Sequence, residues 1–181
     1  MTEQLPYEVV RAFPRFDVRR YPACVLVQVR VGTDAARAAA VGFRQLHRYL
    51  SGVNETGTTF TGTTLDGTAF DGTASLLQEP AGEYEQVVSV ILPHGTDPEG
   101  VPLPLDDSMR IRALPVYEAA ALRFGGGWTG KRLGKQGRTL LDHVSAVRLE
   151  PTGAVYFARL DASWKPGFLT RTEALVRVTS A

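Results

Sequence analysis

The chain has 181 residues, 44% of them hydrophobic, and its 20 basic and 19 acidic residues leave a formal net charge of +1. This balance gives no electrostatic support for a nucleic-acid partner, and no apolar run approaches the ~18 residues of a membrane span. We therefore expect neither nucleic acid nor a membrane as a partner. Cys24 is the only cysteine. That excludes an internal disulfide framework, and with no secretory signal apparent we expect a cytoplasmic protein.

The first part of the chain predicts two strands and a helix. Residues 9–18 are expected to form a strand that bends at Pro14, and the alternating valines of residues 25–31 predict a strand with one buried face. A helix is predicted over Asp34–Leu50. Asp34 can accept the free N–H groups of its first turn, and apolar residues then recur at helical spacing. The Ser-Gly pair that follows should end it.

The rest of the chain predicts a second helix and further strands. The Thr- and Gly-rich stretch Thr56–Thr73 is expected to form a polar hairpin, and Pro93–Pro104 a loop. The second helix is expected over Thr129–Arg148. The remaining strands are expected at Tyr84–Leu92, Met109–Arg112, Glu118–Phe124, Ala154–Leu160 and Glu173–Val178.

An imperfect internal repeat links the two parts. The stretch Val10–Tyr21 recurs as Ile111–Leu122, at an offset of 101 residues. Solenoid repeats have periods of ~20 to 50 residues, so we interpret this repeat as two copies of one α+β half. We predict a single domain, residues 1–181, whose halves (about 1–105 and 106–181) are related by a pseudo-two-fold axis. Such an arrangement predicts a pocket or groove between the halves.

The sequence contains no P-loop, nucleophile elbow or HExxH motif. His47 borders the apolar stripe of the first helix, and it is either an ordinary boundary residue or an axial ligand of a haem iron. Trp164 and Phe168 flank a Pro-Gly turn, where they either pack locally or cover a ligand pocket. No histidine has a second ligand at metal-binding spacing within its own element.

Glu173 opens the last predicted strand. It is either a strand-end charge in a surface ion pair or a carboxylate at the mouth of a pocket. The second case allows an enzyme without a cofactor, acting on an apolar small molecule by proton transfer or water activation. Glu173 would then be the general acid or base, helped by Tyr84 or Tyr117.

Taken in order, several short motifs resemble the SOUL haem-binding family across nearly the whole chain. The matching stretches are Tyr7-Glu8-Val9, Phe16 to Pro22, Gly42-Phe43, Ser51 to Asn54, Ile91-Leu92-Pro93, Pro102-Leu103-Pro104, Phe124-Gly125-Gly126 and Leu169 to Glu173. The resemblance implies a curved eight-stranded antiparallel sheet or distorted barrel with two long helices.

The same resemblance implies a small apolar or tetrapyrrole ligand, with haem as the possible cofactor. One branch of the family is thought to place an axial histidine where this chain has Arg20. Other members are thought to hold the ring through apolar contacts and basic groups on its propionates. Arg44 and Arg48 are the expected basic groups, and Arg171 of the closing motif is counted with them. His47 is the candidate metal ligand.

Overall fold

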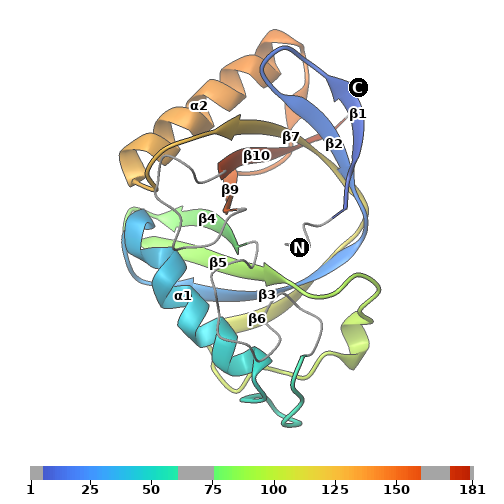
Figure 1. Ribbon diagram of the computed structural model, residues 1–181, viewed down its shortest axis with the longest axis vertical. Helices are drawn as coiled ribbons and strands as arrows, with labels where there is room; N and C mark the ends of the chain where they lie inside the picture. The colour runs from blue at the N-terminus through green and yellow to red at the C-terminus, as the bar shows by residue number, and fades with distance from the viewer. Residues whose placement is uncertain (1–5, 61–75, 160–171, 180–181) are drawn as a thin grey trace.

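A computed structural model describes residues 6–60, 76–159 and 172–179. Two helices, α1 (Ala35–Leu50) and α2 (Gly130–Ala146), lie against a large curved antiparallel sheet (Figure 1). The strands are β1 (Glu8–Ala12), β2 (Asp17–Tyr21), β3 (Cys24–Val31), β4 (Leu76–Gly82), β5 (Glu85–Ile91), β6 (Met109–Leu114), β7 (Tyr117–Phe124), β8 (Glu150–Pro151), β9 (Tyr156–Arg159) and β10 (Thr172–Thr179). The expected α+β class is confirmed, although within the described residues the sheet has ten strands instead of eight and is not closed.

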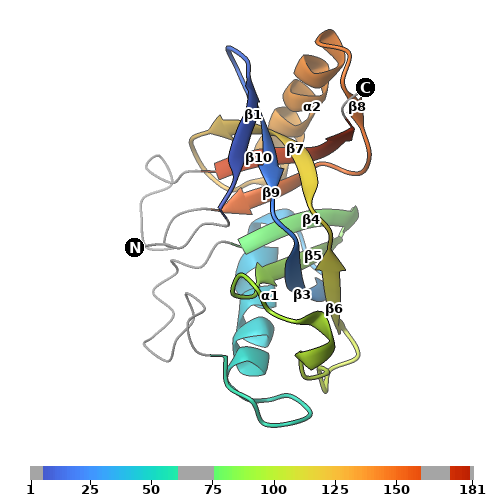
Figure 2. The same ribbon diagram turned by 90° about the vertical axis from the view of Figure 1, so that its right-hand side faces the viewer.

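The strand order is β1-β2-β7-β10-β9-β4-β5-β3-β6, with β8 paired to β10 off this path. Two long runs, one formed by β2 and β3 and the other by β6 and β7, hold this sheet together. β2 pairs with β7 from Asp17 opposite Ala121 to Tyr21 opposite Tyr117, and β3 continues in the same register against β6, with Cys24 opposite Leu114. Figure 2 shows these runs side by side along the length of the molecule.

The strand pairings are symmetric between the two parts of the chain. β3 pairs with β5 and β6, and correspondingly β7 pairs with β10 and β2, while β4 meets β9 at the centre. This symmetry relates β2 to β6 and β3 to β7. The sequence repeat instead matches Asp17 of β2 to Glu118 of β7, so it does not coincide with the symmetry of the sheet. The duplication of one half therefore stays a prediction.

Both helices begin as predicted, and α2 ends at Ala146, two residues before the predicted end at Arg148. Asp34 caps α1 by accepting hydrogen bonds from the backbone N–H groups of Ala36 and Arg37, and Thr129 caps α2 by accepting from that of Arg132. Ser51 caps the C-terminus of α1, and Gly52 follows with a φ of 101°. That left-handed conformation is readily available to glycine alone, which explains the Ser-Gly stop.

Each helix covers its own part of the sheet. α1 packs on β3 and β5 over a core that includes Val27, Leu46 and Val88, whereas α2 packs on β7 and β10 over Leu140 and Val176. The opposite, inner face of the curved sheet carries two smaller clusters, which share Leu77 and Tyr117. This inner face therefore continues across both parts of the molecule.

The start of the chain differs from the sequence prediction. Residues 9–18 form no single bent strand, because the chain reverses around Pro14 and β1 pairs back on β2 as an antiparallel hairpin. The fixed φ and missing N–H of proline suit this turn. Most of the predicted hairpin at Thr56–Thr73 lies outside the described residues, and its described beginning contains one isolated bridge, Ser51 opposite Thr59.

Candidate functional site

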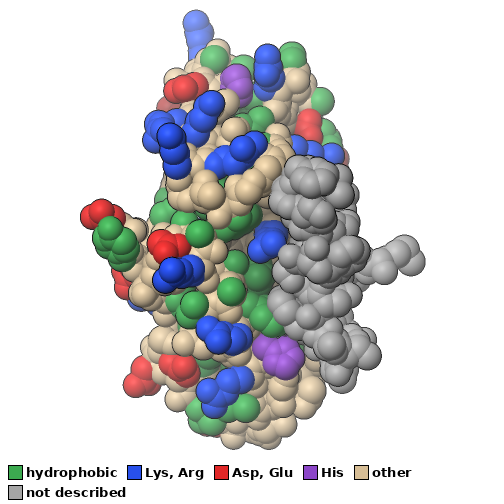
Figure 3. Space-filling model, turned by 60° about the vertical axis from the view of Figure 1, so that its left-hand side comes forward, with side chains coloured by type: hydrophobic (Ala, Val, Ile, Leu, Met, Phe, Trp, Pro, Cys, Tyr) green, Lys and Arg blue, Asp and Glu red, His purple; other side chains and the backbone are tan. Residues whose placement is uncertain are grey.

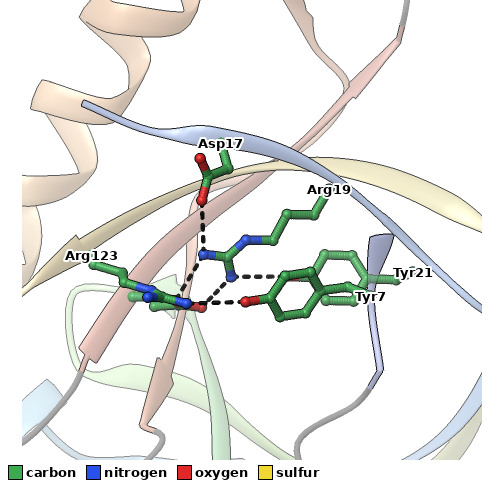
Figure 4. Close-up of polar contacts among 6 residues, drawn as sticks. Tyr7, Asp17, Arg19, Tyr21 and Arg123 are labelled. Atoms are coloured by element: carbon green, nitrogen blue, oxygen red, sulfur yellow. Dashed lines mark hydrogen bonds and ion pairs between the residues drawn. The ribbon is translucent and has the colours of Figure 1, made fainter. Parts of the chain in front are cut away.

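A cluster of charged and aromatic side chains with a buried centre occupies the inner face of the sheet (Figure 4). Alternation along β2 brings Asp17, Arg19 and Tyr21 to this face, because every second side chain of a strand points the same way. β7 contributes Arg123 and β10 contributes Glu173. Their backbones are adjacent, since Glu173 lies directly opposite Arg123 in the register.

Glu173 is the centre of this cluster. Its Oε2 accepts a hydrogen bond from Nη1 of Arg19 at 2.8 Å, and its Oε1 accepts from Nη2 of Arg19 at 3.0 Å and from Nε of Arg123 at 2.8 Å. The pair with Arg19 is bidentate, the geometry in which a guanidinium binds a carboxylate best. Arg19 is 1% exposed and Glu173 3% exposed.

Aromatic rings enclose the Arg19 guanidinium. It lies 4.3 Å from the ring centroid of Tyr7, and that ring is tilted against Tyr21 at 5.6 Å. Asp17 contacts the same guanidinium at 3.5 Å. Burial acts to lower the pKa of Arg19, but the hydrogen bonds and charge of Glu173 outweigh it and raise that pKa further above its ordinary value.

A second set of polar groups continues along the inner face toward β3. Tyr117 stacks on Tyr21 at 5.2 Å, and the Arg177 guanidinium lies 5.0 Å from the Tyr117 ring. Burial raises the pKa of Tyr117 to about 12 and that of Tyr156 well above its ordinary value. Cys24 is buried here as well, and burial raises the pKa of its thiol.

This geometry bears on the predicted acid–base role of Glu173. The carboxylate is buried, which a general acid or base in a pocket requires, yet both of its oxygens already accept guanidinium hydrogen bonds. Tyr84, one of its two predicted helpers, is 69% exposed. The contacts are those of a buried ion-pair network that ties β2, β7 and β10 together. The catalytic role of Glu173 stays a prediction.

The basic groups predicted for a tetrapyrrole lie together on α1. Arg44 and Arg48 are exposed and His47 is half-buried, and their spacing of three and four residues puts all three on one side of the helix. The His47 ring packs against Phe43 at 5.7 Å. Neither arginine forms an ion pair with another described residue, although the charge of Arg48 adds to the hydrogen bonds from Ser108 that lower the pKa of Asp106.

Three predicted ligand-binding residues cannot be placed against this face. Trp164, Phe168 and Arg171 lie outside the described residues. Within the described ranges no three His, Cys, Asp or Glu side chains gather as a metal ion would require. Searching the same ranges for a helix with the length and apolar character to cross a membrane gives none.

Sequence reasoning singled out Glu173 but missed Arg19 and Arg123, the two arginines that donate hydrogen bonds to it. The trace of it in the sequence is the pair Arg19-Arg20 between Val18 and Tyr21, because one of two successive strand residues must face inward. Two adjacent arginines gave no sign of which one faced inward. Only the pairing with β7 shows that Arg19 points toward Glu173 while Arg20 pairs with Glu118 on the other side.

Comparison with known proteins gives a family and a fold. The family model described as SOUL heme-binding protein matches residues 2–177. No curated protein matches the chain. Among solved structures, the C-terminal domain of EcmrR is 13% identical with a TM-score of 0.61, over 97% of this chain and 99% of that one. A hydrolase from Listeria innocua is 10% identical with a TM-score of 0.54, over 90% of this chain and 91% of that one. At these identities the likeness shows the fold alone.

Proposed function

The chain belongs to the SOUL heme-binding protein family, and on that premise we propose that it binds haem or a related tetrapyrrole. The observation that carries this proposal is the match over residues 2–177, which includes every described element apart from the end of β10. The fold supports it, because the expected two helices and curved antiparallel sheet are present. A fold alone would not identify the ligand.

The proposed binding surface is the side of α1 that carries Arg44, His47 and Arg48. Two guanidinium groups one helical turn apart suit the two propionate groups of a porphyrin, since charged hydrogen bonds to carboxylates contribute about 1.5–3 kcal/mol each. His47 offers an imidazole with no hydrogen bond to another described residue. The donor set therefore fits the group. Haem would supply an iron centre whose reactivity depends on its axial ligands.

Haem titration followed by absorption tests this proposal. The protein should develop a Soret band on addition of haem, and the double substitution Arg44→Ala, Arg48→Ala should weaken binding at least tenfold. Arg37→Ala is the matched control, because Arg37 lies on the same helix, is exposed, and contacts Asp34 at 3.7 Å. An unchanged spectrum at micromolar haem would rule the proposal out.

Metal-free protoporphyrin separates the two roles assigned to α1. If His47 is an axial ligand, His47→Ala should move the Soret band of the haem complex and leave the affinity for metal-free protoporphyrin unchanged. If His47 is only a boundary residue packed on Phe43, neither measurement should change. The arginine substitutions should weaken the binding of both ligands, because both carry propionates.

A further inference from the structure

A groove runs between the two helices on the outer side of the sheet, at the end of α1 opposite to the proposed haem surface. Its cavity volume is about 730 Å³, and its walls include Leu133 and Leu141 of α2 with Val155 and Phe157 near β9. Ligand pockets typically measure ~300–1,000 Å³. Figure 3 views the molecule from this side and shows apolar side chains between basic groups above and below them.

The groove is open because α2 presents glycines to it. Gly134 and Gly137 line it. A Cβ added at Gly134 would meet only the Arg138 guanidinium, at 3.7 Å, whereas one at Gly137 would be in contact with Val155 at 3.4 Å and Phe157 at 3.5 Å. A larger side chain at position 134 would therefore fit into the groove without a clash.

A buried chain of hydrogen bonds ends at the groove. The Trp128 indole donates from Nε1 to Oε1 of Gln78 at 3.1 Å and to the carbonyl oxygen of Ala35 at 3.1 Å. Gln78 Nε2 donates in turn to that carbonyl oxygen at 3.0 Å and to Oε1 of Gln86 at 3.1 Å. Gln86 is 4% exposed and lines the groove.

The chemistry of Trp128 fixes the direction of this chain. An indole nitrogen can only donate, so Gln78 must turn its carbonyl oxygen toward Trp128 and its amide nitrogen toward Gln86. Gln86 must then accept with Oε1, and its own Nε2 is directed away from Gln78. That Nε2 donates to no described residue, and the cavity lies beside it. This nitrogen keeps contact with the open groove, so a ligand oxygen there would give it a fixed acceptor in place of water.

We propose that this groove is a second ligand site, for an uncharged apolar molecule with one carbonyl or ether oxygen that accepts a hydrogen bond from Gln86. The rim argues for an uncharged ligand, because it carries both signs: Asp34 and Glu83 on one side and Arg138 on the other. The site is separate from the haem surface. Arg44 lies nine residues beyond Ala35, or roughly 13 Å along α1 at 1.5 Å per residue.

The neutral ketone dye prodan, whose emission depends on its surroundings, tests this proposal in the full-length protein. Binding should shift its emission to shorter wavelength. Gln86→Met removes the donor and keeps the length of the side chain, and it should weaken binding about tenfold, as expected for one buried hydrogen bond. Gly134→Leu should fill the groove and abolish binding. It should not lower the melting temperature, since leucine is the better helix former.

Two controls make the result specific. N-phenylnaphthylamine, an apolar dye without a carbonyl, should bind the wild type and Gln86→Met equally. The Arg44→Ala, Arg48→Ala protein should bind prodan as the wild type does, so a failure of haem binding leaves this test intact. Undiminished prodan binding by Gly134→Leu would overturn the proposal. So would displacement of prodan by haem together with loss of prodan binding in the double arginine variant.

Discussion

Arg19 is a charged side chain in a place where charge is costly. At 1% exposure it depends on the carboxylate of Glu173 and on the rings of Tyr7 and Tyr21 for its surroundings. Taking an ion out of water costs several kcal/mol unless it is paired and hydrogen-bonded. The bidentate contact between β2 and β10, which are not neighbours in the sheet, supplies the counter-ion, whereas Nε of Arg19 is buried without a hydrogen-bond partner among the described residues.

Removing the negative charge from this cluster should destabilise the fold strongly. We expect Glu173→Gln to lower the free energy of unfolding by about 3–5 kcal/mol, because it leaves the buried Arg19 with only the half-buried Asp17, at 3.5 Å, as a counter-ion. Urea denaturation measures the loss. Glu85→Gln is the control: it breaks an ion pair with Arg30 of similar length, 2.9 Å, in which both side chains are exposed, and it should cost about 0–1 kcal/mol. Equal costs for the two variants would show that Glu173 is not a buried structural partner.

Tyr117 should make stability depend on alkaline pH. Burial raises its pKa to about 12 in the folded protein, against about 10 for an unfolded chain. The unfolded state therefore loses the phenol proton first, and the stabilising contribution is complete below pH 10 and disappears as pH rises toward 12. Urea midpoints measured across this range should fall less steeply for Tyr117→Phe than for the wild type. The exposed Tyr84→Phe should leave the slope unchanged.

At the scale of elements, the sequence predicted both helices closely and the strands unevenly. Caps and apolar spacing are local signals, so the Asp34 cap and the Ser-Gly stop could be read directly. β4 was not predicted. Its sequence, LLQEPAG, lacks β-branched residues and contains a proline, and it is a strand because β5 and β9 pair with it on both sides. The prediction of one strand bent at Pro14 was wrong, because the hydrophobic pattern of the sequence does not show that β1 pairs with β2.

Gly42 allows α1 to lie close to the sheet. A Cβ at this position would stand 2.6 Å from Cβ of Val88 in β5, a distance that requires the helix or the strand to move. We expect Gly42→Ala to destabilise the protein by about 1–3 kcal/mol through overpacking. Thermal or urea unfolding measures this.

The matched substitution is on the other helix. Gly134→Ala adds the same methyl group where its nearest neighbour is a flexible guanidinium at 3.7 Å, and it should stabilise α2 by about 1 kcal/mol. Stabilisation by both substitutions would mean that α1 does not need the close approach.

At the scale of the whole molecule, the two long runs make the parts of the chain interdependent. β2 and β3 belong to the first part, yet β2 pairs with β7 and β3 pairs with β6 of the second. β4 and β9 join the parts again at the centre. The resemblance to a family predicted two helices and a curved sheet. The contact between Arg19 and Glu173, 154 residues apart in sequence, could not be predicted in this way, because it depends on strand pairing that no local sequence pattern encodes.

Neither half should fold alone. We expect peptides spanning residues 1–105 and 106–181 to lack cooperative unfolding when separate, because the cut removes the pairings of β2 with β7, β3 with β6 and β4 with β9, and to regain it when mixed. Circular dichroism during thermal denaturation measures this. The intact chain should unfold in one transition. A dispersed amide spectrum from the isolated second peptide would contradict the prediction and indicate two independent units.

The position of Cys24 makes its thiol a reporter of local opening of the sheet. The thiol is 8% exposed, lies where β3 meets β6 on the inner face, and has its pKa raised by burial. Thiol reagents attack the thiolate, so the closed protein should react slowly. Alkylation of this single thiol would then require the junction of β3 and β6 to open. The rate of alkylation would therefore measure how often this junction opens under native conditions.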